Sequence, residues 1–170
     1  NDDEIAKNLK MIANHGQQVK YYHKVTGCNS RLDSIQASIL NIKLKYLNSY
    51  SDSRNQMAKN YDKSFSEIPE LTIPKRQYNS THVFHQYTIR ILSNKRDNLA
   101  KHLSDLNIPH GIYYPIPLHK QKAYKSDDFK DEDYTNTNLL CEEVISLPMH
   151  SELNDDQIDF ISEKVIKFLS

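Results

Sequence analysis

The sequence predicts an α/β fold in which two helices precede a small sheet of about three strands with flanking helices. Three observations support this. Apolar residues recur every three or four positions in the first third of the chain and again near its end. A run rich in β-forming residues covers 82–92. From that run onward, strand-like and helix-like segments alternate.

The first predicted helix starts at Asp2 or Asp3, either of which can cap it, and ends before Gly16, which suits a left-handed helix stop. Its apolar face comprises Ile5, Leu9 and Ile12. The polar stretch 17–27 is expected to be a loop.

A long second helix is predicted over 30–47, because Ser30 and Asp33 can form a capping box. Its apolar positions form an unusually wide stripe, which indicates burial on more than one side. Helical character continues to Phe65, and the prolines that follow exclude a regular helix. We place a domain boundary here, with 1–68 as the first part and 69–170 as the second.

The second part is expected to alternate strands and helices. The order is a strand at 82–92, a helix at 95–107, a strand at 108–114, a long connection at 115–134, a helix at 135–143, a strand at 144–147, and a final helix capped by Asn154. Connections as long as 115–134 are often functional in compact domains.

Composition excludes several classes of protein. Lys and Arg total 22 and so do Asp and Glu, whereas a nucleic-acid binder usually has a basic excess. No stretch approaches the roughly 20 apolar residues of a membrane span. The acidic start predicts that there is no signal peptide, and only Cys28 and Cys141 are present. We therefore expect a reduced, cytoplasmic protein with free thiols, and a disulfide is the minor alternative.

Two groups of residues could carry chemistry. Asn29 and Arg31 lie at the start of the predicted long helix, where free N–H groups suit an anion, although simple capping is the alternative. Tyr114 and His119 lie where a strand meets the long connection and could bind sugar hydroxyls or move protons. The alternative is a buried aromatic strand end with a surface histidine.

A metal site is not expected. His82 and His85 are three residues apart, and on a strand such residues face opposite sides. The sequence also lacks the glycine-rich motifs that hold nucleotide phosphates.

Five short motifs resemble one known family in order and spacing. They are Asn14-His15-Gly16, then 27–37 (Gly-Cys-Asn-Ser-Arg-Leu-Asp-Ser-Ile-Gln-Ala), His85-Gln86-Tyr87, Tyr114-Pro115-Ile116-Pro117-Leu118-His119, and Leu147-Pro148-Met149-His150. The sequence is similar in these motifs to the DegT/DnrJ/EryC1/StrS family of sugar-nucleotide aminotransferases, and the resemblance runs from about residue 2 to 169.

The resemblance implies the aspartate-aminotransferase fold, of which this chain matches only the C-terminal half. It implies that 1–68 are the end of the large cofactor domain with a connecting helix, and 69–170 the small domain. It also implies pyridoxal 5'-phosphate as cofactor, a homodimer with shared active sites, and transfer of an amino group, usually from glutamate, to a nucleotide-linked keto sugar.

Site roles follow from the same resemblance. Asn29 would reach the cofactor phosphate of the partner subunit, while Arg31, Tyr114 and His119 would lie on the substrate side. The family's Schiff-base lysine lies upstream of the matched part, so we expect no catalytic residue in this chain and no turnover by it alone. The alternative is a non-catalytic subunit that binds sugar nucleotides or completes a partner's site.

Overall fold

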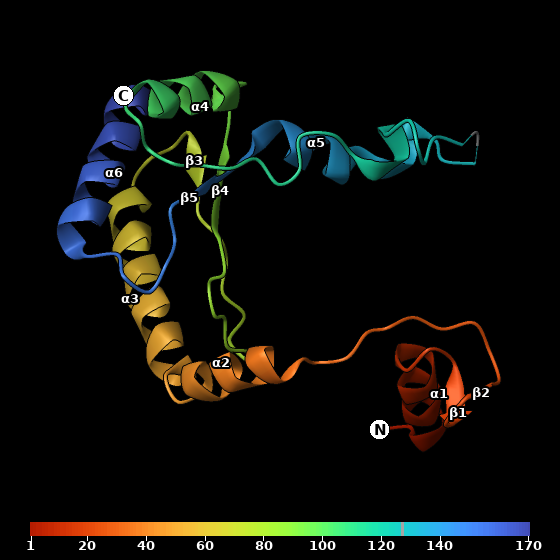
Figure 1. Cartoon of the computed structure of the whole chain (residues 1–170). Helices are drawn as coiled ribbons and strands as arrows, with labels where there is room; N and C mark the ends of the chain where they lie inside the picture. The colour runs from red at the N-terminus through yellow and green to blue at the C-terminus, as the bar shows by residue number, and fades with distance from the viewer. Residues whose placement is uncertain (127) are drawn as a thin grey trace. The chain divides into compact units, whose positions relative to one another are not determined.

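The computed structural model describes residues 1–126 and 128–170 (Figure 1). By internal contacts the chain divides into two compact units, 1–47 and 48–170. The boundary expected after residue 68 concerns the domains of an intact enzyme, and it stays a prediction. Each unit is described by itself below.

The first unit opens with helix α1, Asp3–Ala13, as predicted. Asp2 caps it, because its Oδ1 accepts the N–H groups of Glu4 and Ile5 at 2.9 and 3.0 Å. The stretch expected to be a loop instead contains a short antiparallel hairpin of β1, Gln17–Val19, and β2, Tyr22–His23. Strands this short do not show the alternation of apolar and polar residues that predicts a strand, so the sequence did not indicate them.

The predicted single helix over 30–47 is wrong. Helix α2 covers Ser34–Leu44, and α3, Leu47–Phe65, follows after a turn. Asp33 is the N-cap of α2, and its N–H donates to Gln36 Oε1 at 3.3 Å. The expected burial on more than one side is also wrong within this chain, because α2 has no buried residue.

The second unit contains an antiparallel sheet of order β3–β4–β5. The strands are β3, Leu71–Thr72, β4, Tyr87–Ile91, and β5, Val144–Leu147. The number of strands and β5 are as predicted, but β3 was missed and β4 is shorter than expected. The predicted strand at 108–114 is wrong, since this segment makes only an isolated bridge between Gly111 and Ser146.

The predicted helices of this unit are confirmed as α4, Arg96–Asp105, α5, Thr135–Glu143, and α6, Asp155–Leu169. Asn154 caps α6 by accepting the Gln157 N–H at 2.9 Å. The expected long connection contains two short 3₁₀ turns, η1, Leu118–Lys120, and η2, Asp131–Tyr134.

Helices α3, α4 and α6 cover one face of the sheet and form the core with it (Figure 1). On β4, residues 87, 89 and 91 are fully buried and alternate with partly buried neighbours, as a half-covered strand requires. The opposite face carries the Thr88 and Ser146 hydroxyls, 2.7 Å apart. In the described part of the chain, no helix has both the length and the apolar character needed to cross a membrane.

Candidate functional site

Asn29 lies in an extended segment that pairs with the end of α1. The Cys28 N–H donates to the Ile12 carbonyl at 2.9 Å, and the His15 N–H donates to the Cys28 carbonyl at 3.0 Å. The Ser30 N–H donates to the Ala13 carbonyl at 3.0 Å. Two of the sequence motifs are therefore held together, and α1 fixes the backbone of Asn29.

This pairing requires glycine at two positions. Gly16 has φ +76°, and a Cβ there would lie 1.7 Å from the Val25 carbonyl oxygen. A Cβ on Gly27 would lie 2.1 Å from the Gly16 nitrogen. Any side chain at either position would collide with backbone, so the glycines of the two motifs allow the close approach that places Asn29.

The expectation that Asn29 and Arg31 start a helix is wrong, because α2 begins only at Ser34. Both side chains are exposed, and Arg31 Nε donates to Asn29 Oδ1 at 3.2 Å. This bond engages the amide oxygen. Among the described residues, no hydrogen bond uses the Asn29 Nδ2 group. The pair thus offers two amide N–H donors beside a guanidinium.

The motif segments 85–87 and 147–150 of the second unit meet residues 109–113 at a cavity of about 270 Å³. Its lining comprises His85, Gln86, Pro109, His110, Gly111, Tyr113, Ser146, Leu147, Pro148 and Met149. His82 is not among them, and its Nδ1 accepts the Phe84 N–H at 2.9 Å. In residues 1–126 and 128–170, no three His, Cys, Asp or Glu side chains form a group that could hold a metal.

Residues 112–126 and 128–143 project from the sheet and are called the arm here (Figure 1). At its base lies a second, mostly apolar cavity of about 650 Å³. The lining comprises Tyr113, Tyr114, Ile116, Pro117, Leu118, Gln121, Thr137, Leu140, Cys141 and Val144. Tyr113 borders both cavities, and Tyr114 is 74% exposed, so its hydroxyl is accessible.

His119 is not the surface side chain that an exposed loop suggests, since only 8% of its side chain is accessible. Its Nε2 lies 3.0 Å from Asp131 Oδ1, and its ring stacks on Tyr134 with centroids 4.5 Å apart. Asn138 Nδ2 donates to the same oxygen at 3.0 Å. The sequence did not predict these contacts of His119 and Asp131, because the spacing of residues in a loop does not show which of them meet.

Lys120 completes the group, with Nζ 2.8 Å from Asp131 Oδ1. Its hydrogen bond, followed by that from His119, lowers the pKa of Asp131 to about 2. Because the folded-state pKa is depressed, the stabilisation is present at neutral pH. It is lost as the pH falls from about 4 toward 2.

We expect NMR titration of the Asp131 carboxyl carbon in the 170-residue chain to give a pKa of about 2. Lys120→Ala should raise this pKa toward the ordinary 3.8, and by more than His119→Ala does, because Lys120 is the larger cause. Lys122→Ala, on the same arm, is the control and should leave the midpoint unchanged. An Asp131 pKa near 3.8 in the unaltered chain would contradict this ion pair.

The sequence model of the DegT/DnrJ/EryC1/StrS aminotransferase family matches residues 1–166. The chain belongs to this family. It is 39% identical to the "Pleiotropic regulatory protein" of Geobacillus stearothermophilus, covering 99% of this chain and 45% of the relative. It is 37% identical to the UDP-N-acetyl-3-dehydro-alpha-D-glucosamine 3-aminotransferase of Acidithiobacillus ferrooxidans, covering 99% and 44%.

The fold agrees with this membership. A crystal structure of Streptomyces venezuelae DesV, in complex with a ketimine intermediate, matches with a TM-score of 0.92 and 30% identity. The match covers 99% of this chain and 45% of DesV. The chain therefore has the C-terminal part of the aspartate-aminotransferase fold, as the sequence predicted. It spans about half the length of the relatives it matches.

The cofactor of this DegT/DnrJ/EryC1/StrS family carries a phosphate, and the Asn29–Arg31 pair fits such a group. A phosphate dianion requires N–H donors and benefits from a nearby positive charge. The Asn29 amide and the Arg31 guanidinium supply both from an exposed, backbone-anchored segment. The chemistry of the donors therefore suits a phosphate.

Proposed function

We propose that this chain is the C-terminal part of an enzyme that transfers an amino group from glutamate to a nucleotide-linked keto sugar. The observation that carries the proposal is the family match over nearly the whole chain, together with relatives named as nucleotide-sugar transaminases. Family membership indicates pyridoxal 5'-phosphate as the cofactor. When bound, this cofactor supplies the electron sink that amino transfer requires.

The roles proposed for single residues follow the family motifs. Asn29 donates its amide N–H groups to the cofactor phosphate of the partner subunit, and Arg31 holds an anionic group of the substrate. Tyr114 contacts the substrate with its exposed hydroxyl, beside the apolar cavity. His119 was expected on the substrate side as well, but its enclosed ring favours a different role, which is argued below.

Residues 1–68 are proposed to be the end of the large cofactor domain and 69–170 the small domain of a homodimer with shared active sites. Support comes from the apolar stripes of α1 and α2, which this chain leaves uncovered. They comprise Ile5, Leu9, Ile12, Ile35, Ile39, Leu40, Ile42 and Leu44, all at least 42% exposed. Stripes of this size favour a covering surface from outside these residues.

The test is a transaminase assay on the intact protein that contains this chain. With added pyridoxal phosphate and glutamate, a nucleotide-linked keto sugar should be aminated and 2-oxoglutarate released in equal amounts. The 170-residue chain alone is the matched control and should show no turnover, because none of its lysines matches the family's Schiff-base lysine. An intact protein that aminates no nucleotide sugar would overturn the proposal.

A second candidate is a non-catalytic subunit that binds sugar nucleotides or completes a partner's site. The Geobacillus relative is named as a regulatory protein and not as a transaminase, which supports the non-catalytic part of this candidate. Calorimetry with the sugar nucleotide, combined with an assay for released 2-oxoglutarate, separates the two. The second candidate requires the intact protein to bind a sugar nucleotide without releasing 2-oxoglutarate, whereas the first requires stoichiometric release.

A further inference from the structure

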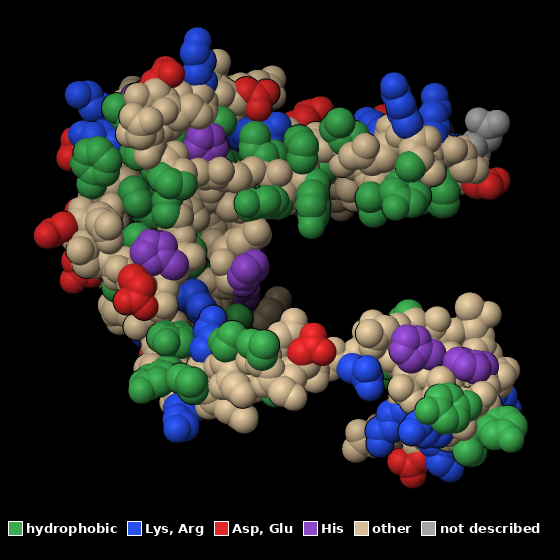
Figure 2. All heavy atoms as spheres, viewed as in Figure 1, with side chains coloured by type: hydrophobic (Ala, Val, Ile, Leu, Met, Phe, Trp, Pro, Cys, Tyr) green, Lys and Arg blue, Asp and Glu red, His purple; other side chains and the backbone are tan. Residues whose placement is uncertain are grey.

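The arm consists of two stretches that run side by side and must be held together. One leaves the sheet through Tyr113 and η1, and the other returns through η2 and α5 (Figure 1). Hydrophobic side chains gather along one side of the arm (Figure 2). Without links between its stretches, a projecting segment of this kind has little core of its own to order it.

Asp131 provides the polar links. It accepts hydrogen bonds from His119 and Asn138 at 3.0 Å and from Lys120 at 2.8 Å, all at Oδ1. Asn138 Nδ2 also donates to the Asp131 carbonyl at 3.0 Å. One carboxylate thus joins η1 on the outgoing stretch to η2 and α5 on the returning stretch.

Aromatic rings surround the hydrogen bond between His119 and Asp131. The His119 ring lies over Tyr134 at 4.5 Å with an interplanar angle of 22°, and Phe129 meets Tyr134 edge-on at 6.4 Å. Stacking and the Asp131 bond leave the imidazole only 8% accessible. A polar ring is enclosed at low cost only when it is hydrogen-bonded, and His119 meets this condition.

The hydrogen-bonded group around Asp131 connects the two walls of the apolar cavity. One wall of the cavity is the outgoing stretch up to Leu118 and Gln121, which flank His119. The other wall is α5 with Thr137 and Cys141, on either side of Asn138. The link between His119 and Asn138 through Asp131 therefore sets the distance between the two walls, one of which carries Tyr114.

We propose that His119 is a positioning residue: with Asp131, Tyr134 and Asn138 it forms a clasp that holds the two walls of this cavity together and fixes the loop bearing Tyr114. The part of the proposal that concerns substrate rests on the proposed function. His119 then acts on the nucleotide sugar through the loop and not by direct contact.

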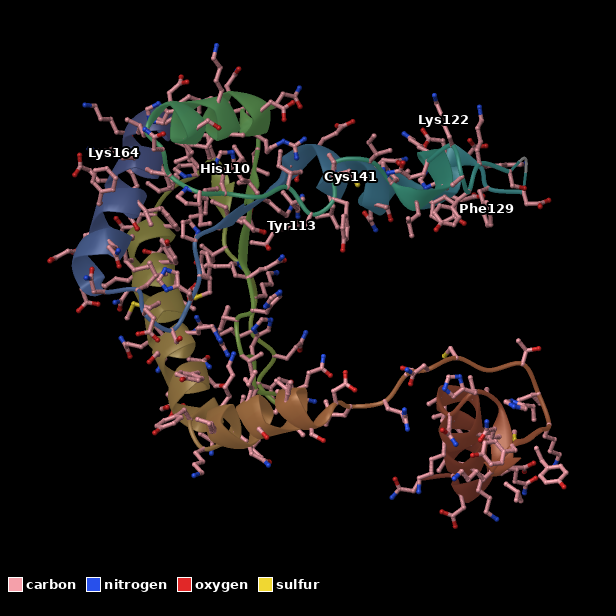
Figure 3. All side chains as sticks on the ribbon, viewed as in Figure 1. His110, Tyr113, Lys122, Phe129, Cys141 and Lys164 are labelled. Carbon is pink, nitrogen blue, oxygen red and sulfur yellow. The ribbon has the colours of Figure 1, made fainter. Side chains whose placement is uncertain are left out.

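Cys141, which lies on α5 (Figure 3), lines the cavity. It is 9% exposed, whereas Cys28 is exposed, so the reactivity of Cys141 reports directly on the clasp. In a Cys28→Ser background of the 170-residue chain, iodoacetamide modifies Cys141 as the only thiol. His119→Ala and Asp131→Ala should each speed its alkylation about tenfold, since lost hydrogen bonds favour local opening. Unchanged alkylation in both variants would overturn the proposal.

Two further variants distinguish loss of the clasp from a general destabilisation of the arm. His119→Gln keeps a donor at similar reach and should restore much of the protection, whereas His119→Phe keeps the stacking alone and should restore less. Lys122→Ala, exposed on the same arm, should alkylate as the unaltered chain does. Circular dichroism must match in all variants. Equal acceleration by Lys122→Ala would show that the arm opens without regard to the clasp, and would refute the proposal.

The intact protein tests the functional part. His119→Ala should raise KM for the nucleotide sugar about tenfold while kcat and the KM for glutamate change less than about twofold, because a positioning loop affects binding of one substrate. His119→Gln should recover most of the loss. A fall in kcat with unchanged KM would contradict positioning. If the intact protein aminates no sugar, the proposed function fails while the alkylation result still decides on the clasp.

Discussion

Tyr61→Ala should lower the free energy of unfolding of the second unit by about 3–5 kcal/mol, as truncation of a buried aromatic ring commonly does. Tyr61 is fully buried on α3 and stacks on Phe65 and Tyr87, with centroids 5.8 and 4.8 Å away. The change leaves a cavity between the helix and β4. Hydrogen exchange of the β4 and β5 amides in the 170-residue chain measures this loss.

Two matched variants test whether the ring is the cause. Tyr61→Phe removes only the hydroxyl, which donates to the Pro148 carbonyl at 3.2 Å, and should cost about 1 kcal/mol. Tyr78→Ala, at a tyrosine that is 98% exposed, should stay within about 0.5 kcal/mol. Similar losses in Tyr61→Phe and Tyr61→Ala would contradict ring burial as the source.

Tyr61 also connects the core to the candidate site. The carbonyl that accepts its hydroxyl belongs to Pro148, which lines the smaller cavity. Burial raises the pKa of the Tyr61 hydroxyl, so it remains a neutral donor at any physiological pH. The motif segment after β5 is thereby anchored to α3.

Most helices with strong local signals were predicted correctly, whereas the apolar segment 30–47 was not, because it divides into α2 and the start of α3. The Asn154 cap and the apolar period of α6 lie within the segment itself, and the same holds for α1, α4 and α5. Elements that depend on distant pairing were predicted less well: β5 was found, but β4 is shorter than predicted and β3 was missed. β3 has two residues and exists because Leu71 and Thr72 pair with β4, which no local pattern indicates.

The wrong strand at 108–114 shows the same limit. Its residues Ile108, Ile112 and Tyr113 have β propensity, yet only Gly111 bonds to β5 through Ser146. Pro109 lacks an N–H group and cannot continue a ladder in the interior of a sheet. Whether a β-prone segment becomes a strand depends on a free neighbouring edge, and the sequence does not show which edges are free.

The candidate site shows the same contrast between residues of one short motif, which the sequence can single out, and contacts between distant residues, which it cannot. The exposed Asn29 and Arg31 belong to one compact motif, so the sequence singles them out, but they lie before α2 and not at its N-terminus as predicted. The clasp around His119 could not be foreseen, because Asp131 is twelve residues away along an irregular path. Predicting that contact requires the course of the loop.

Asn29→Ala in the intact protein should weaken retention of the phosphate-bearing cofactor about 10- to 150-fold, since hydrogen bonds to charged groups contribute roughly 1.5–3 kcal/mol. The prediction rests on the proposed role of Asn29. Arg31 Nε engages Oδ1 of the amide, which leaves the Nδ2 donors for a phosphate. The pyridoxamine form is the ligand to measure, by equilibrium dialysis, because it has no covalent bond to the protein.

Because Arg31 engages Oδ1 of the Asn29 amide, Asn29→Asp is the variant that tests the Nδ2 donors most directly. Asn29→Asp has nearly the same shape, and its carboxylate can still accept from Arg31. It replaces both N–H donors with negative charge, however, which repels a phosphate dianion. Asn29→Asp should therefore weaken retention more than Asn29→Ala, whereas a residue that only caps or spaces the segment would tolerate the isosteric change better. Asn8→Ala, on an exposed face of α1, is the control. Retention that is equal in Asn8→Ala and in both Asn29 variants would remove Asn29 from the phosphate site.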